Sequence, residues 1–110
     1  MKPVVSYIEI GAADANATRT FFTQLFSWQF HLMGAGPEGW FQTSSIKAGV
    51  HGNDPSPGIL PFFQVPDLEA GVSRVKELGG EAGQVTDEPG FGRFSLCRDP
   101  QGVRFGLHQD

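Results

Sequence analysis

Residues that could contact a ligand lie on the last predicted strand of the chain. The stretch VRFGLHQD alternates apolar and polar residues, which is typical of a strand with one buried face. Arg104 and His108 share its polar face with Gly106. An arginine can hold a ligand carboxylate through two parallel hydrogen bonds, and a histidine can bind a ligand or a metal ion. We therefore interpret Arg104 and His108 as candidate ligand-binding residues.

The first predicted strand places Tyr7 and Glu9 on one face. A carboxylate on the inner face of a central strand must be solvated by an open cleft or paired with a base such as Arg104. We interpret Tyr7 and Glu9 as ligand contacts, together with His51 at the end of another strand. A relocated metal site made from Glu9, His51 and His108 is an alternative. A second alternative makes His108 a partly exposed residue near the C-terminus.

An apolar wall is predicted on the strand Ile59–Val65, where Leu60, Phe62 and Gln64 point to the same side. Two apolar side chains and one amide are a typical lining for a small-molecule pocket. Phe91 lies between glycines in the loop EPGFG, and we interpret it as a mobile lid over the ligand. Core packing is the alternative for this ring.

Two helices must support these strands. Asp14 and Asp67 are expected to be their N-caps, and Gly79-Gly80 should end the second helix. Apolar residues of helical spacing form a stripe in each helix: Ala17, Phe21, Phe22, Leu25 and Phe26, then Leu68, Val72, Val75 and Leu78. The remaining elements are predicted strands at Val4–Ile10, Trp28–Met33, Gly39–Ser45, Ile46–His51, Ile59–Val65, Glu81–Thr86, Arg93–Arg98 and Val103–Gln109.

The order of elements repeats on either side of the turn-rich segment NDPSPG. A shift of 53 positions pairs Asp14 with Asp67, Ala17 with Ala70, Leu25 with Leu78, Gly49 with Gly102 and Val50 with Val103. These identities fall at caps, core positions and turns. The sequence therefore predicts an α+β fold of two βαβββ modules, residues 1–54 and 58–110, within one domain.

Composition excludes several classes of function. A chain of 110 residues suits one domain, and its formal net charge of -4 argues against nucleic acid or an anionic membrane as partner. Cys97 is the single cysteine, so an intramolecular disulfide and a CxxC motif are excluded. We expect a soluble, cytoplasmic protein, because the N-terminus lacks a signal-peptide pattern and no apolar run is long enough to span a bilayer.

Three segments carry a family resemblance: YIEIGAADANATRTFFTQLFSWQF, FFQVPDLEAGVSRVKELGG and FGRFSLCRDPQGVRFGLHQ. In order and spacing they resemble the vicinal oxygen chelate superfamily, which includes glyoxalases, bleomycin-resistance proteins and extradiol dioxygenases. The resemblance implies that the strands of the two modules form a curved mixed sheet, a cup that holds the ligand, with both helices outside. Members commonly associate through sheet edges or exchanged modules, so the resemblance also implies a homodimer.

The metal ligands of the superfamily are His, Glu or Gln on four strands. The matching positions here are Tyr7, Leu60 and Gly106, with His51 or Asn53 as the fourth. Leucine and glycine offer no donor atom, and a neutral tyrosine is a poor ligand. We therefore predict a metal-free protein, without a cofactor, that binds a small, partly apolar ligand. The alternatives are a metal-dependent lyase, isomerase or dioxygenase with relocated ligands, and a non-catalytic dimerisation module.

Overall fold

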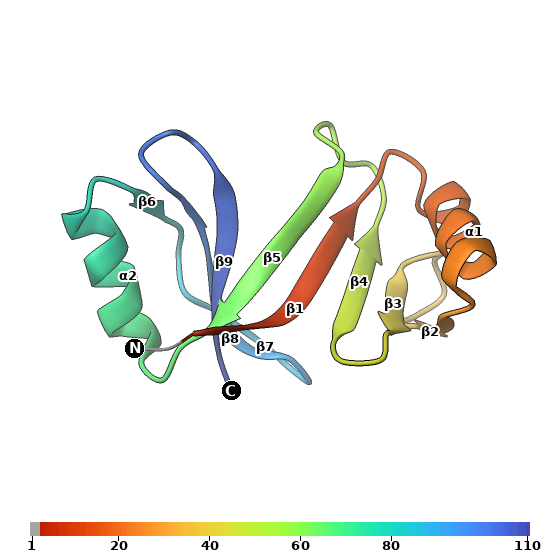
Figure 1. Cartoon of the computed structure of the whole chain (residues 1–110), viewed down its shortest axis with the longest axis horizontal. Helices are drawn as coiled ribbons and strands as arrows, with labels where there is room; N and C mark the ends of the chain where they lie inside the picture. Colours follow the sequence, from red (N-terminus) through yellow and green to blue (C-terminus); the bar gives the residue numbers. More distant parts are fainter. Residues whose placement is uncertain (1–2) are drawn as a thin grey trace. The chain divides into compact units, whose positions relative to one another are not determined.

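The computed structural model describes residues 3–110, which form two compact units (Figure 1). The N-terminal unit is Tyr7–Leu60, and the C-terminal unit combines residues 3–6 with Pro61–Asp110. In chain order the elements are β1 (Val4–Gly11), α1 (Ala15–Phe26), β2 (Gln29–Leu32), β3 (Gly39–Gln42), β4 (Lys47–His51), β5 (Gly58–Gln64), α2 (Leu68–Glu77), β6 (Glu81–Ala82), β7 (Thr86–Glu88), β8 (Gly92–Arg98) and β9 (Arg104–Gln109).

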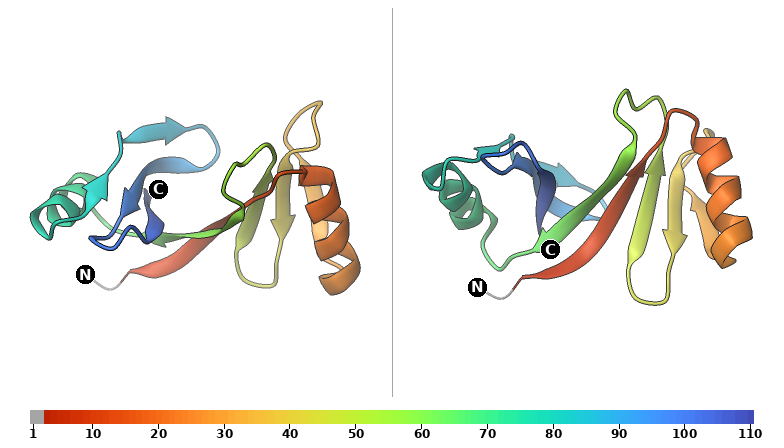
Figure 2. Two further views of the ribbon diagram at one scale, coloured as in Figure 1. Left: turned by 90° about the horizontal axis from the view of Figure 1, so that it is seen from above. Right: turned by 45° about the horizontal axis from the view of Figure 1, so that its top comes forward.

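The strands of the N-terminal unit form a mixed sheet in the order β2-β3-β4-β1. β1 runs parallel to β4, whereas the β2–β3 and β3–β4 pairs are antiparallel. α1 packs on one face of this sheet (Figure 2). The core between them consists of Ile10, Ala15, Phe41, Ala48 and Val50. Since α1 is the one helix among residues 7–60, the opposite face has no helix of this unit over it.

α1 begins where the sequence predicted. The Asp14 carboxylate accepts a hydrogen bond from the Ala17 amide (3.2 Å), which satisfies one of the free amides of the first turn. The helix ends at Phe26 because Ser27 adopts a left-handed conformation (φ 59°) and its amide bonds the Thr23 carbonyl.

The apolar stripe of α1 is only partly used for packing against the sheet. Phe22 packs on the core, but Phe21 and Leu25 are 59% and 56% exposed. With 3.6 residues per turn, Ala15, Arg19 and Phe22 share the side that faces the sheet, so Phe21 and Leu25 are turned to the outer side.

The C-terminal unit has the strand order β5-β9-β8-β6, and β7 also pairs with β8. β5 and β9 are parallel, while β8 is antiparallel to β9. α2 covers one face through a core that contains Val65, Leu68, Cys97 and Leu107, with Phe105 packed against it. Phe105 and Leu107 therefore lie on the side of β9 that α2 covers.

Two predicted strands are shorter or broken. Gly39–Ser45 ends at Gln42, because the Thr43 hydroxyl accepts from the amides of Ser45 and Ile46 and turns the chain. Glu81–Thr86 is divided into β6 and β7, both of which pair with β8. The pairing shifts by one residue between them, from Ala82↔Cys97 to Thr86↔Phe94, so one extra residue bulges out of the strand.

The predicted α+β class is confirmed, with two modules that each carry one helix and a mixed sheet. The second module has one strand more than βαβββ, owing to the bulge. Within residues 3–110, neither helix has the length and apolar character needed to cross a membrane.

Candidate functional site

The helix-free face of the N-terminal unit, opposite α1, carries three of the predicted site residues. Successive side chains of β1 alternate between faces, so Ile8 and Ile10 pack toward α1 while Tyr7 and Glu9 point the other way. β4 lies beside β1 in parallel register and ends at His51, which is paired with Gly11. The structure thus brings the side chains of Tyr7, Glu9 and His51 together.

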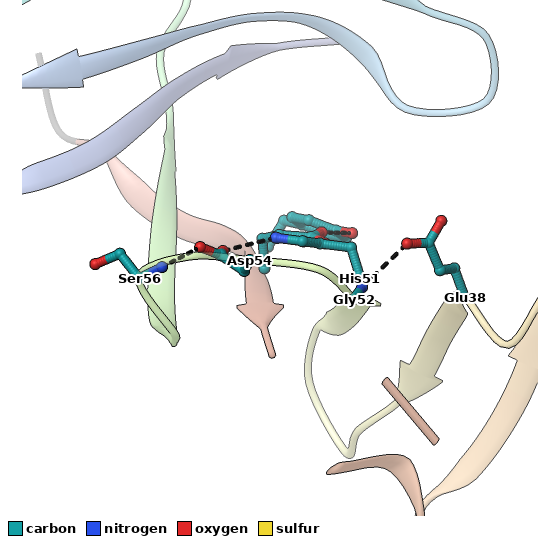
Figure 3. Close-up of polar contacts among 7 residues, drawn as sticks. Glu38, His51, Gly52, Asp54 and Ser56 are labelled. Carbon is teal, nitrogen blue, oxygen red and sulfur yellow. Dashed lines mark hydrogen bonds and ion pairs between the residues drawn. The ribbon is translucent and has the colours of Figure 1, made fainter. Parts of the chain in front are cut away.

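These side chains form one hydrogen-bonded chain with Asp54, which we call the Tyr7–Asp54 chain. The Tyr7 hydroxyl donates to Glu9 Oε1 (2.7 Å), and Glu9 Oε2 lies 2.5 Å from His51 Nδ1. His51 Nε2 lies 2.8 Å from Asp54 Oδ2. The other Asp54 oxygen, Oδ1, accepts from the Ser56 amide (2.8 Å), as Figure 3 shows. Every atom of the imidazole that can form a hydrogen bond therefore faces a carboxylate.

Two glycines make room for this chain. A Cβ atom at Gly49 would overlap the Tyr7 hydroxyl and the Glu9 carboxylate, and a Cβ atom at Gly11 would overlap the Asp54 carboxylate. Sequence reasoning missed both glycines and Asp54. Their importance depends on the parallel register of β1 and β4, which the sequence does not display.

Backbone hydrogen bonds position Asp54 after the end of β4. The amides of Asn53 and Asp54 donate to the carbonyls of Ala13 and Ala12 (3.1 and 3.0 Å), so this loop is fixed against the start of α1. The amide of Gly52 donates to the Glu38 carboxylate (3.0 Å; Figure 3). The segment NDPSPG was predicted as a turn, with Asn53 as a possible metal position, and it also supplies the Asp54 carboxylate of this site.

The charge state of His51 follows from its two partners. Burial disfavours the imidazolium, but the hydrogen bonds and charges of Glu9 and Asp54 outweigh burial and raise the pKa of His51 above its ordinary value of 6.5. A carboxylate accepts hydrogen bonds and does not donate them, so only the doubly protonated ring satisfies both partners.

The C-terminal unit buries His108, which is only 5% exposed. The interpretation of His108 as a partly exposed residue is therefore wrong. Its Nε2 donates to the Phe91 carbonyl (2.7 Å), and its Nδ1 lies 3.1 Å from the Ser6 hydroxyl. The Phe91 ring also stacks on the imidazole, with 4.2 Å between ring centroids. Two strands and a loop thus fix this ring in place.

The face of the C-terminal unit opposite α2 is covered by aromatic side chains. Phe62, Phe91 and Phe94 meet edge to face, with centroids 5.6–5.9 Å apart. A Cβ atom at Gly106 would overlap the Phe62 ring, so this ring lies directly over the glycine. Phe62, Phe91 and His108 are therefore brought together in one cluster of the C-terminal unit.

The other predicted site residues are Leu60, Gln64 and Arg104. Gln64 donates to the Asp110 carboxylate (2.9 Å) near the end of β5. Arg104 begins β9 on an exposed position, in register with Arg98. Leu60 is half-buried on β5. The base that pairs with Glu9 is His51.

Comparison with known sequences gives a family. The sequence model described as a glyoxalase-like domain matches residues 7–108. The chain belongs to the glyoxalase-like domain family. Methylmalonyl-CoA epimerase from Mycobacterium tuberculosis has a similar structure, with a TM-score of 0.72 at 16% identity over 96% of this chain and 86% of that chain. A glyoxalase/bleomycin resistance protein/dioxygenase superfamily member from Vibrio splendidus has a TM-score of 0.71 at 16% identity. The match covers 99% of this chain and 100% of that chain. The predicted superfamily is confirmed.

A curated sequence relative is the anthracycline biosynthesis protein DnrV of Streptomyces peucetius. It is 27% identical over 124 aligned positions, which cover 93% of this chain and 45% of that protein. This glyoxalase-like domain thus spans about half the length of the curated relative.

The superfamily's metal positions in this glyoxalase-like domain do not fit a metal ion. The Tyr7 hydroxyl is turned toward Glu9, Leu60 has no donor atom, and the space beside Gly106 holds the Phe62 ring. Both nitrogens of His51 face carboxylates. Among residues 3–110, no group of three or more His, Cys, Asp or Glu side chains is arranged to hold a metal ion.

The alternative metal site combined Glu9, His51 and His108. Glu9 and His51 lie together, but His108 belongs to the C-terminal unit, where Ser6 and Phe91 contact its two ring nitrogens.

Proposed function

We propose that this glyoxalase-like domain binds a small, partly apolar molecule on the helix-free face of its N-terminal unit, without a metal ion. The observation that carries the proposal is the Tyr7–Asp54 chain, whose polar groups are ordered in advance but remain accessible. The side chain of His51 is 39% exposed and that of Glu9 is 25% exposed. Pre-ordered polar groups reduce the entropy lost on binding and fix the orientation of a ligand.

An aromatic side chain lies next to the polar chain on the same face. The strand register aligns Trp40 with Gly49, and Gly49 with Glu9, in one row across β3, β4 and β1. The indole stacks on His31 with 4.2 Å between centroids, and Lys47 Nζ lies 4.4 Å from its centroid. A ring and hydrogen-bonding groups side by side suit a ligand that is itself partly aromatic and partly polar.

The relatives support a small molecule as the ligand, and the curated relative makes an aromatic one the first class to test. The Streptomyces peucetius relative is named for anthracycline biosynthesis, and a methylmalonyl-CoA epimerase of similar fold was captured in complex with 2-nitronate-propionyl-CoA. We also propose that the protein acts in the cytoplasm as a homodimer. Ligand contacts at Leu60, Phe62, Gln64, Phe91, Arg104 and His108 stay a prediction from the sequence.

A thermal-shift screen with anthracyclines and peptide antibiotics tests the proposal. A ligand present at 100 times its Kd raises the free energy of unfolding by about 2.7 kcal/mol. We expect this gain to be lost in Glu9→Gln and retained in Glu81→Gln, an exposed glutamate in the other unit. Chelator, or added nickel, zinc, manganese or iron, should leave the gain unchanged.

Three results would count against the proposal: no stabilising compound, equal stabilisation of Glu9→Gln and the unmodified protein, or stabilisation that requires a metal ion. The first favours the dimerisation module, and the last favours the metal-dependent enzyme.

A further inference from the structure

Lys47 lies on the same helix-free face as the Tyr7–Asp54 chain. Along β4, Ala48 and Val50 belong to the core beside α1, so Lys47 and Gly49 point to the opposite side of the sheet. The register between β1 and β4 places Lys47 directly beside Tyr7. An exposed ammonium group therefore adjoins the polar groups of the candidate site.

The indole of Trp40 restrains the Lys47 side chain. Lys47 Nζ lies 4.4 Å from the indole centroid, where the π electrons of the ring attract a cation. His31 stacks on the same indole, with 4.2 Å between ring centroids. Because β3 lies between β2 and β4, His31 and Lys47 approach the indole from opposite sides. Trp40 thus orders the ammonium group before a ligand arrives, which reduces the entropy that binding costs.

Lys47 supplies this face with a positive charge that has no acidic partner. The four carboxylate oxygens of Glu9 and Asp54 each already face a hydrogen-bond donor. Lys47, in contrast, forms no ion pair with any residue of the described part of the chain, 3–110. Its ammonium group has three N–H donors. An added anion would therefore gain a partner here without breaking a bond of the Tyr7–Asp54 chain.

We propose that the ligand of this face is an aromatic acid whose carboxylate binds Lys47. This inference rests on the proposed function and names the class of ligand for it. Since both faces of the indole are covered, a ligand ring would meet the edge of Trp40, an arrangement that aromatic pairs favour. A cationic ligand is disfavoured, because Lys47 and the imidazolium of His51 would repel it.

The formal net charge of -4 does not oppose such binding strongly. Charges spread over the surface are screened beyond about 10 Å at an ionic strength of about 0.1 M, whereas Lys47 would contact the carboxylate directly. The Glu9 carboxylate on the neighbouring strand is paired with His51, which offsets its repulsion of an anion. The local charge of Lys47 therefore determines the preference.

Isothermal titration calorimetry with an anthraquinone carboxylate and the anthraquinone carboxamide of the same ring position tests the inference. The two probes share their rings and differ by one charge. Lys47→Met removes the ammonium group but keeps an unbranched side chain beside Trp40, and Lys47→Arg retains a cation. Lys76→Met is the matched control, because Lys76 is an exposed lysine of α2 and its replacement changes the net charge by the same amount.

We expect the unmodified protein to bind the carboxylate about 5-fold more tightly than the carboxamide, the effect of one exposed ion pair. Lys47→Arg and Lys76→Met should keep this preference, and Lys47→Met should remove it. Raising NaCl from about 20 mM to about 500 mM should also reduce it, because salt screens an exposed pair. Circular dichroism should give the same melting curve for all three variants, since both lysines are exposed.

Equal affinity for the two probes would overturn the inference and leave the proposed function standing. A preference that survives in Lys47→Met, or that Lys76→Met weakens equally, would also overturn it, because another cation or the net charge would then be its cause. Binding of neither probe would exclude an aromatic acid as the ligand. The screen with anthracyclines and peptide antibiotics tests the proposed function independently of that result.

Discussion

Protonation of His51 should make the stability of this protein depend on pH above neutrality. The imidazolium donates to both Glu9 and Asp54, whereas the neutral ring has one N–H and leaves one carboxylate facing a lone pair. The pKa of His51 is raised in the folded state. The imidazolium of His51 therefore contributes its full stabilisation below about pH 6.5, the pKa of histidine in an unfolded chain. This stabilisation is lost as the pH rises through the higher pKa of the folded state.

The size of this effect is limited by exposure. The His51 side chain is 39% exposed, so solvent screens both ion pairs. Pairs of this kind contribute about 0.3–1 kcal/mol each, which gives about 1 kcal/mol for the two. For a domain of this size, 1 kcal/mol corresponds to about 4 °C in Tm.

Thermal melts followed by circular dichroism between pH 6 and 9 measure this loss, with His51→Gln as the reference. Glutamine does not titrate, so the difference between the two proteins isolates His51 from His31 and His108. An NMR titration of the His51 ring gives its pKa directly. A pKa at or below 6.5, or parallel pH profiles for the two proteins, would refute the assignment of a doubly bonded imidazolium.

Other perturbations test packing and capping. Gly49→Ala should lower the free energy of unfolding, measured by urea titration, by about 1–3 kcal/mol, because the added methyl group displaces the Tyr7 hydroxyl and Glu9. Gly34→Ala, with open space around it, should have little effect in the same titration. Leu68→Ala should cost about 2–5 kcal/mol in urea unfolding, since Leu68 is fully buried, and a cost below 1 kcal/mol would contradict its place in the core. Asp67→Ala should cost about 1 kcal/mol by removing the α2 N-cap, and an unchanged Tm would contradict that role.

The elements that were predicted well are those that local signals in the sequence encode. Asp14 and Asp67 cap their helices as expected, because an N-cap is read from a side chain and the amides of its own first turn. Gly79, with φ of 88°, ends α2 for a similarly local reason. The break between β6 and β7 was not predicted, because a one-residue shift against β8 depends on a partner strand far along the sequence.

The candidate site was predicted only where a local pattern determines it. Alternation along β1 was enough to place Tyr7 and Glu9 on one face. The roles of Asp54 and Gly49 follow from the parallel register between β1 and β4, which no local pattern encodes. His108 was placed on the correct face by alternation, but its burial depends on Ser6 and Phe91, two contacts outside its own strand.

The bond between Ser6 and His108 joins positions 102 residues apart in sequence. Closing so long a loop has a large entropic cost, and contacts of high sequence separation slow folding. Residues 7–60 pair over shorter sequence separations, so we expect them to fold first during synthesis, whereas the contact between Ser6 and His108 cannot form until residue 108 has left the ribosome. Folding of the nascent chain should therefore proceed in two stages, with the short segment before Tyr7 held without its strand partners until the second stage.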